Sequence, residues 1–254
     1  MANIISIINN KGGTGKTTTV LNLGAALAKK KKRVLLVDLD SQGNLTSTFD
    51  SAVSEQGIGE LLVGSCTIND IIKSNSYISI LPSTEKLLDF EFQLNNEPGR
   101  EYMLKEQLEK ISDDFDFILI DCPPSLGTLS VNSLVAANSF IVPMQAENFA
   151  FIGLDRIMLI TEKVKKRMNP NLELGGILFV KLTPRTKFSQ AVISNLSNNN
   201  NFEDKLFNTY IRQDIALMES GAFKQNIFEY SPRSRGSQDY MDLAKEILKR
   251  YGQK

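Results

Sequence analysis

The sequence of 254 residues holds 29 basic and 29 acidic side chains, no histidine, and 42% hydrophobic residues. This length and composition suit one α/β domain, spanning residues 1–254, with a sizeable core. The lack of histidine excludes Ser-His-Asp hydrolases, Cys-His nucleophiles and histidine-ligated metal sites. A net charge of zero is unusual for a constitutive nucleic-acid binder, so any DNA contact must come from a local patch.

No targeting or membrane segment is readable in the sequence. No apolar run approaches the ~20 residues that cross a bilayer, and the N-terminus enters a strand without the basic and apolar regions of a signal peptide. We therefore expect a cytoplasmic protein. Cys66 and Cys122 are far apart and form no C-x-x-C pair, so we expect buried small hydrophobic side chains rather than a zinc or redox site.

A glycine-rich stretch, residues 10–18, lies between a predicted strand and a predicted helix. The strand Ile4–Ile8 is short and β-branched, and Val20–Leu27 carries apolar residues at helical spacing. Strand, glycine-rich turn and helix form the context of a phosphate-binding loop, in which backbone N–H groups and the helix N-terminus face the anion. The predicted phosphate cradle comprises Gly12, Gly13, Thr14, Gly15, Lys16, Thr17 and Thr18.

The loop departs from the general G-x-x-x-x-G-K-[ST] pattern at its start. Asn10 stands where the first glycine belongs, and Lys11 precedes the glycine pair as a second cation near Lys16. In the general pattern, Lys16 reaches the β- and γ-phosphates and the Thr17 hydroxyl binds Mg²⁺. The alternative is a glycine-rich turn with a solvated lysine, which the flanking strand and helix disfavour.

The motif Lys-Gly-Gly-x-Gly-Lys-Thr-Thr resembles the deviant Walker A motif of the ParA/MinD family of P-loop ATPases. In that family the additional lysine reaches across a dimer to the nucleotide of the partner subunit. The resemblance therefore implies an ATP hydrolase that uses ATP and Mg²⁺, with catalytic roles for both Lys11 and Lys16.

Two carboxylates follow the second predicted strand. The run of residues 34–40 is typical of a parallel strand covered on both faces, and it ends in two carboxylates, Asp38 and Asp40. Ligands of open α/β sheets bind at the carboxyl ends of strands, where two acids need a cation or a reaction to offset their repulsion. The alternative is a pair of solvated loop acids.

The sequence Asp-x-Asp-x-Gln-Gly-Asn resembles the second signature of the same family. This resemblance implies that Asp38 helps to hold the Mg²⁺ shell through water and that Asp40 orients the attacking water. The segment of residues 115–125 contains another apolar strand, which delivers Asp121 at its end. It resembles a Walker B strand, which implies that Asp121 lies near the ligand sphere of Mg²⁺.

The remaining elements complete a single doubly wound, mostly parallel sheet, with the site where the first, second and fourth strands end. We predict further strands at 77–82, 140–143 and 174–180, and helices at 58–62, 67–73, 87–94, 102–111, 153–168, 188–196 and 239–251, with a polar loop over 47–57. The first helix ends in the cationic run 29–33, which complements the helix dipole, with a DNA or membrane contact as the alternative.

A second cationic turn precedes the predicted helix at 188–196. Family members carry an arginine here that contributes to nonspecific DNA binding, and Arg185 matches it by position, with Lys187 nearby. The resemblance implies that both residues bind DNA, although a solvated loop explains them equally well. Residues 211–220 resemble the family's segment near the adenine base, which gives a location without a particular base contact.

We interpret the chain as a ParA-type ATPase for plasmid or chromosome segregation. The resemblance implies that Mg-ATP closes a homodimer, that the dimer binds nonspecific DNA and so associates with the nucleoid, and that a centromere-binding ParB-type partner stimulates hydrolysis. The alternative is a MinD-like, membrane-cycling ATPase anchored by the helix at 239–251.

Two observations weigh against the other members of this family. The apolar face of the last helix, expected at Met241, Ala244, Leu248 and Tyr251, is modest and lacks Trp and Phe, so we expect it to dock on the sheet and expect no membrane partner. A relative of nitrogenase iron protein would need a cysteine arrangement that Cys122, directly after Asp121, does not provide.

Overall fold

A seven-stranded sheet forms the centre of the computed structural model, which describes residues 1–49, 55–75, 77–94, 96–147, 150–199 and 202–252. The strand order is β3-β4-β2-β5-β1-β6-β7, and every neighbouring pair is parallel except β3 and β4. The strands are β1 (Asn3–Ile7), β2 (Val34–Asp38), β3 (Lys73–Asn75), β4 (Ile78–Leu81), β5 (Phe117–Asp121), β6 (Ser139–Met144) and β7 (Glu173–Phe179). The predicted doubly wound, mostly parallel fold is confirmed.

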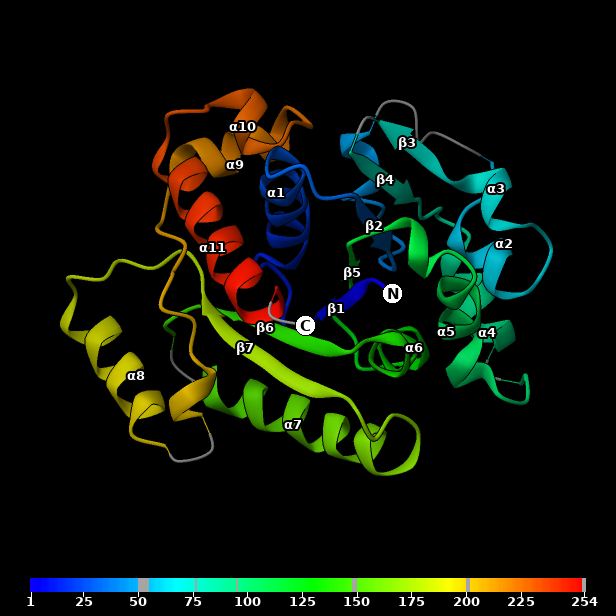
Figure 1. The fold of residues 1–254 in the computed structure, drawn as a ribbon. Helices are drawn as coiled ribbons and strands as arrows, with labels where there is room; N and C mark the ends of the chain where they lie inside the picture. Colours follow the sequence, from blue (N-terminus) through cyan, green and yellow to red (C-terminus); the bar gives the residue numbers. More distant parts are fainter. Residues whose placement is uncertain (50–54, 76, 95, 148–149, 200–201, 253–254) are drawn as a thin grey trace.

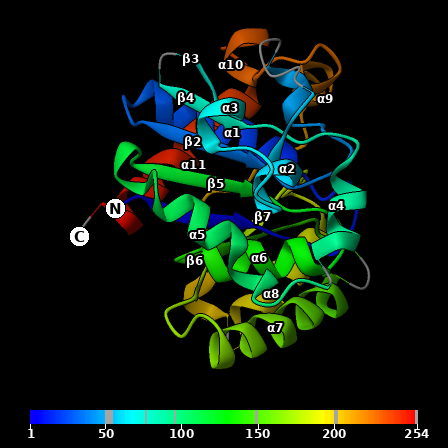
Figure 2. The ribbon, with the colours of Figure 1, turned by 90° about the vertical axis from the view of Figure 1, so that its right-hand side faces the viewer.

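Helices cover both faces of the sheet, as Figures 1 and 2 show. One hydrophobic core lies beneath α1 (Lys16–Lys29), α9 (Ile215–Ala222), α10 (Ile227–Tyr230) and α11 (Arg235–Tyr251). The other core lies beneath α2 (Ile58–Leu62), α3 (Ile68–Ile71), α4 (Leu87–Leu94), α5 (Met103–Glu109), α6 (Thr128–Ala136), α7 (Ala150–Arg167) and α8 (Lys187–Ser197). Because both faces are covered, all residues of β2 and β5 are buried, as their continuous apolar runs predicted.

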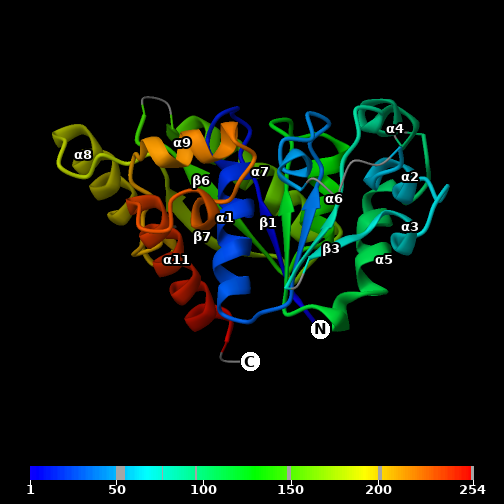
Figure 3. The ribbon, with the colours of Figure 1, turned by 90° about the horizontal axis from the view of Figure 1, so that it is seen from above.

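The register of the central strands brings three predicted site segments together. Ile7 pairs with Asp121, and Asp121 pairs with Asp38 on its other side. The carboxyl ends of β1, β5 and β2 therefore lie side by side. Figure 3 shows the molecule from above: these carboxyl ends point to the side of the sheet opposite the two chain termini.

Several element predictions were wrong or incomplete. The helix expected at 67–73 ends at Ile71, and Lys73–Asn75 forms the antiparallel edge strand β3 because it pairs with β4. Helices α6, α9 and α10 were not predicted. Helix α6 buries polar residues, such as Ser130 and Asn132, together with its apolar ones, so it lacks the polar face that marks a surface helix. Residues 50–54 of the expected polar loop lie outside the described residues.

Helix α11 docks on the sheet layer, as expected, with its buried face shifted from the predicted one: Ala244 is buried, whereas Leu248 and Tyr251 are only partly buried against the core. It begins at Arg235 rather than at residue 239, capped by Ser234, whose hydroxyl accepts from the Ser237 N–H at 3.1 Å. Its buried residues include Tyr240, Leu243, Ala244 and Ile247, and they belong to the core shared with α1. This contact buries most of the apolar side chains of α11. None of the described helices is long and apolar enough to span a bilayer.

The two cysteines differ in environment. Cys122 is fully buried, and its sulfur lies 3.2 Å from the Ser6 hydroxyl and 3.0 Å from the Ser133 hydroxyl. Burial raises its pKa to about 11, which makes the thiol a poor nucleophile. Cys66 is only partly buried, so the expectation holds for one cysteine and only in part for the other.

Asn169 provides a test of how the helical layer is held. Its buried amide nitrogen lies 3.0, 3.2 and 2.7 Å from the carbonyl oxygens of Leu134, Val135 and Ala137, at the end of α6. Asn169→Ala should lower the free energy of unfolding by about 2 kcal/mol, because buried carbonyls lose their donor. Urea unfolding measures this, with exposed Asn198→Ala as the control, expected to change stability by less than about 0.5 kcal/mol. Equal losses in the two variants would contradict the capping role.

Candidate nucleotide-binding site

The loop between β1 and α1 forms an anion cradle. Gly13 and Gly15 have φ angles of 74° and 78°, in the left-handed region that favours glycine, so the backbone curls tightly into α1. The Thr14 hydroxyl donates to the Lys11 carbonyl at 3.2 Å and braces the turn. The first N–H groups of α1 have no partner within the helix and, with its dipole, favour a bound anion.

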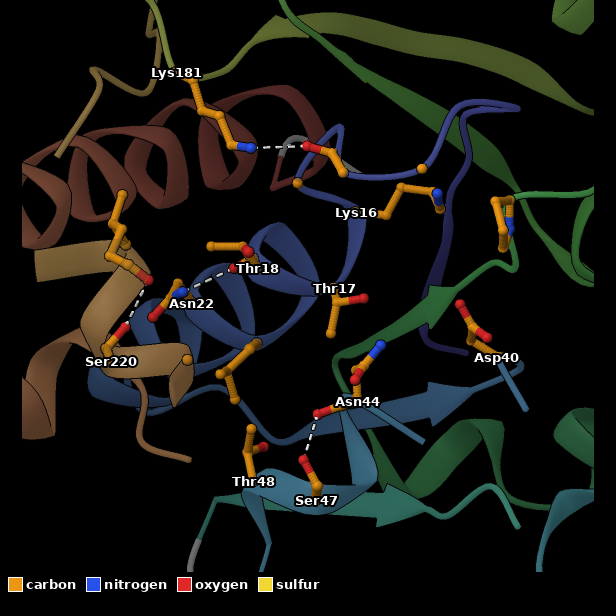
Figure 4. Close-up of a pocket in the computed structure, with 17 residues that line it drawn as sticks. Lys16, Thr17, Thr18, Asn22, Asp40, Asn44, Ser47, Thr48, Lys181 and Ser220 are labelled. Atoms are coloured by element: carbon orange, nitrogen blue, oxygen red, sulfur yellow. Dashed lines mark hydrogen bonds between the residues drawn. The ribbon is translucent and has the colours of Figure 1, made fainter. Parts of the chain in front are cut away.

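A cavity of about 480 Å³ opens in front of this loop (Figure 4). Most of its walls come from three segments: the glycine-rich loop with the start of α1, the segment after β2, and helix α9. Its lining residues are Gly12, Gly13, Gly15, Lys16, Thr17, Thr18, Leu21, Asn22, Asp40, Asn44, Ser47, Thr48, Pro124, Lys181, Leu217, Ser220 and Gly221. The size is sufficient for a nucleotide, and most of the predicted cradle lies on its surface.

Lys16 is the buried cation of the site. Its ammonium donates to the Lys11 carbonyl at 3.2 Å, and only 7% of the residue is exposed. Burial lowers its pKa, while the nearby Asp121 carboxylate acts in the opposite direction. The cation is therefore held at the cavity wall close to an acidic group.

Asp38 and Asp121 are both fully buried on adjacent strands. Asp38 accepts hydrogen bonds from the Asp40 N–H at 3.1 Å, the Thr46 N–H at 2.8 Å and the Thr46 hydroxyl at 2.7 Å. Neither oxygen of Asp121 receives a hydrogen bond of regular geometry from the described residues. Such an orphaned buried carboxylate is costly unless a cation compensates it.

The pKa values of this pair reflect the same lack of compensation. Burial raises the pKa of Asp38 to about 6, against its hydrogen bonds from Thr46. Burial also raises the pKa of Asp121 well above its usual range, and the neighbouring Asp38 adds to the effect. The Thr17 hydroxyl and the Lys16 ammonium lower it again, but by less.

These oxygen ligands fit Mg²⁺. Asp121 offers a carboxylate whose charge Lys16 and the Thr17 hydroxyl compensate only in part, and hard oxygen atoms are the ligands that Mg²⁺ prefers. The described residues contain no group of three or more acidic, cysteine or histidine side chains that could cage a metal. A site with one or two carboxylates, completed by phosphate oxygens and water, is the usual arrangement for Mg²⁺.

The other predicted residues occupy different places. Asp40 lines the cavity and is partly buried, and its carboxylate accepts from the Gln42 N–H at 3.1 Å. Lys11 is not among the cavity-lining residues; its side chain is 62% exposed and forms an ion pair with Glu147. Arg185 and Lys187 are exposed around the start of α8, away from the cavity lining, and neither forms an ion pair with a described residue.

A smaller cavity of about 230 Å³ adjoins the first and shares five lining residues with it: Gly15, Thr18, Lys181, Leu217 and Gly221. The segment expected near the base contributes Ile211–Asp214 and Met218 to its walls. Arg212 is anchored there by Asp239, with a shortest contact of 2.6 Å. The structure therefore brings this segment next to the P-loop.

Sequence reasoning missed two polar contacts to the loop. Gln145 and Lys181 both donate to the Gly13 carbonyl, at 2.8 and 2.9 Å. Both lie close behind the carboxyl ends of strands, β6 and β7, which is the one signal that could have identified them.

Comparison with known proteins agrees with this geometry. A family described as an AAA domain matches residues 2–174. The sporulation initiation inhibitor protein Soj of Bacillus subtilis is 41% identical over 97% of this chain and 98% of its own. The chromosome-partitioning ATPase Soj of Treponema pallidum is 38% identical over 100% of both chains. The crystal structure of cobyrinic acid a,c-diamide synthase from Mycobacterium smegmatis with bound ATP analogue and magnesium has a TM-score of 0.87, with 32% identity over 100% of this chain and 97% of its own.

A strand, a glycine-rich loop with a buried lysine and an aspartate at the end of a neighbouring strand define a P-loop nucleoside triphosphatase. The chain belongs to the ParA/MinD family of P-loop ATPases. It is an ATP hydrolase whose cofactors are ATP and Mg²⁺.

Asp121→Asn tests the cost of the orphaned carboxylate. In EDTA, without nucleotide, the variant should be more stable than the parent protein by about 1–3 kcal/mol at pH 7, because it removes a buried, uncompensated charge. Since folding raises the pKa of Asp121, the penalty is absent below the unfolded pKa of about 3.9 and grows as the pH rises. The stability advantage should therefore vanish below about pH 4.

The same variant should bind Mg-ATP at least about tenfold more weakly, because a charged ligand to the metal is lost. Urea unfolding at several pH values and nucleotide binding across a Mg²⁺ titration measure the two effects. Asp155→Asn, at an exposed position on α7, is the matched control and should change neither. A destabilised Asp121→Asn protein with unchanged Mg²⁺ dependence would contradict this interpretation of the site.

Proposed function

We propose that this ATPase is a partition protein of the ParA type, a single P-loop domain that segregates plasmids or chromosomes in the cytoplasm. Its relatives support this: the Treponema pallidum protein is named a chromosome-partitioning ATPase and matches over its full length. These relatives are 38–41% identical, against 32% for the cobyrinic acid a,c-diamide synthase structure. The observation that carries the mechanism is the position of Lys11, outside the cavity of its own chain.

In this mechanism the backbone N–H groups of residues 12–18 hold the phosphates, and Lys16 binds the β- and γ-phosphate oxygens. Thr17 and Asp121 would hold Mg²⁺ directly, and Asp38 would hold it through water. Bound Mg²⁺ supplies the positive charge that neutralises the phosphate oxygens during transfer. Asp40, at the cavity wall, orients the attacking water. The adenine base is expected near residues 211–218, where the second cavity adjoins the first.

The proposal includes a nucleotide-dependent homodimer. Lys16 already occupies the buried position beside the acidic pair, so a single subunit leaves Lys11 without a phosphate to bind. The exposed ion pair with Glu147 is a weak tether, because such surface pairs contribute about 0–1 kcal/mol. When two subunits meet at this edge of the sheet, each Lys11 would reach the nucleotide of the other subunit and neutralise its phosphate charge.

Lys11→Ala tests the dimer. The variant should still bind ATP as a monomer, but its dimer with a nonhydrolysable ATP analogue should weaken by about 3 kcal/mol, roughly a hundredfold, because a desolvated charge pair is lost. Light scattering after size exclusion, with and without the analogue, measures the dimer. Lys30→Ala removes an exposed lysine at the C-cap of α1, the end of the helix away from the glycine-rich loop, and should dimerise normally. Normal dimerisation of Lys11→Ala would rule out the cross-subunit role.

We further propose that the closed dimer binds nonspecific DNA and associates with the nucleoid through Arg185 and Lys187. Both side chains are exposed, and neither is neutralised by a described carboxylate, so both remain available for DNA phosphates. A centromere-binding ParB-type protein would then stimulate hydrolysis and release the dimer. The neutral overall charge suits such conditional binding, because two subunits must combine their patches before the affinity is useful.

Arg185→Ala tests this patch. The slope of log affinity against log salt is negative, and each lost phosphate contact makes it less steep by about 1. A dimer that loses one Arg185 contact in each subunit should therefore have a slope that is less steep by about 2. Binding to arbitrary duplex DNA at several salt concentrations, with ADP, with ATP and without nucleotide, measures the slope. Lys30→Ala is again the control. If Lys30→Ala weakens DNA binding and Arg185→Ala does not, the DNA contact lies in the cationic run 29–33 instead. ATPase activity without DNA should be unchanged in Arg185→Ala.

A further inference from the structure

Lys181 lies at the junction of the P-loop and the two cavities. It comes two residues after the end of β7, and its ammonium donates to the Gly13 carbonyl at 2.9 Å (Figure 4). Gln145, directly after β6, donates to the same oxygen at 2.8 Å. Two side chains from adjacent strands therefore hold one carbonyl of the glycine-rich loop.

The backbone fixes Lys181 in this position. Its φ angle of 51° is uncommon for a residue with a side chain, and neighbouring hydrogen bonds maintain it. The Leu182 N–H donates to the Ile211 carbonyl at 3.0 Å, and the Gln213 N–H donates to the Leu182 carbonyl at 3.1 Å. The lysine is thus carried by a braced segment rather than by a free loop.

The ammonium of Lys181 has donors to spare. An ammonium carries three N–H donors, and only one is used on Gly13. No described carboxylate forms an ion pair with Lys181, and the residue is exposed and lines both the 480 Å³ cavity and the 230 Å³ cavity. A phosphate oxygen entering the larger cavity would meet this charge.

We propose that Lys181 is a nucleotide-binding residue that acts in two ways. It holds the Gly13–Thr14 peptide in place, so that a loop rich in glycine is already ordered before the nucleotide arrives. Glycine loses more conformational freedom than any other residue when it is fixed, and ordering a binding loop in advance raises affinity. The same ammonium then adds a charge-assisted contact to the phosphate chain.

This inference rests on the proposed phosphate cradle, but it does not depend on dimerisation, DNA binding or partition. The two lysines that line the larger cavity come from different elements of the fold. Lys16 belongs to the loop and its helix, whereas Lys181 reaches the loop from the end of β7. Loss of Lys16 therefore tests the cradle, and loss of Lys181 tests the residue that holds it.

The experiment measures binding of Mg-ATP and Mg-ADP to the full chain by calorimetry. Lys181→Met keeps the length of the side chain but removes its charge and donors, and we expect about tenfold weaker binding of both nucleotides. Lys181→Arg restores a cationic donor and should recover binding to within about threefold. Gln145→Leu should weaken Lys181→Met further when the two are combined, because Gly13 then loses both donors.

The controls separate the possible failures. Lys163→Met changes an exposed lysine on α7, outside both cavities, and should leave nucleotide affinity unchanged. Lys16→Met should abolish measurable binding, and if it does not, the cradle itself is wrong. Two outcomes would overturn the role of Lys181. In the first, Lys16→Met abolishes binding but Lys181→Met binds nucleotide within about twofold of the parent protein. In the second, Lys181→Arg binds as weakly as Lys181→Met. The melting temperature without nucleotide should be similar in all the Lys181 variants, which excludes a general loss of structure.

Discussion

Two buried carboxylates on adjacent strands, Asp38 and Asp121, impose the constraint on which the site depends. An uncompensated buried charge costs several kcal/mol, a large part of the 5–15 kcal/mol by which a folded domain is usually stable. Asp38 recovers part of this cost through three hydrogen bonds, whereas Asp121 receives none of regular geometry from the described residues. The free protein is therefore less stable than it could be, and a cation bound beside Asp121 would offset part of that cost.

The fold can carry this cost because the acids lie at the ends of strands that are buried along their whole length. Strands β2 and β5 are covered on both faces, so their backbone positions are fixed by two hydrophobic cores. The cores meet at the sheet, and the charged groups stand only where the sheet stops. A change within a core would thus move the acids together with their strands, while a change at the edge alters the chemistry alone.

Local patterns in the sequence were enough to predict strands β1, β2 and β5 and the glycine-rich turn between β1 and α1, because each is a continuous stretch with its own spacing. The places of Gln145 and Lys181 were not predictable, since their common partner Gly13 is more than 130 residues away in the chain. The same holds for β3, which is polar and becomes a strand only through its pairing with β4. Helix α6 was not predicted for a different reason. Polar and apolar residues of this helix are buried together, so its sequence lacks the apolar stripe and polar face that mark a surface helix.

In the proposed dimer, Lys11 and Lys16 would give one short loop two separate roles. Lys16 is buried beside Asp121, so its charge is committed to its own site. Lys11 lies five residues earlier, is mostly exposed, and is paired with Glu147 in a contact of small energy. If Lys11 exchanged this ion pair for a contact with a desolvated phosphate on another subunit, the interaction free energy gained would be far larger than that lost. The free energy of nucleotide binding would then be available to hold two subunits together, and hydrolysis would remove it.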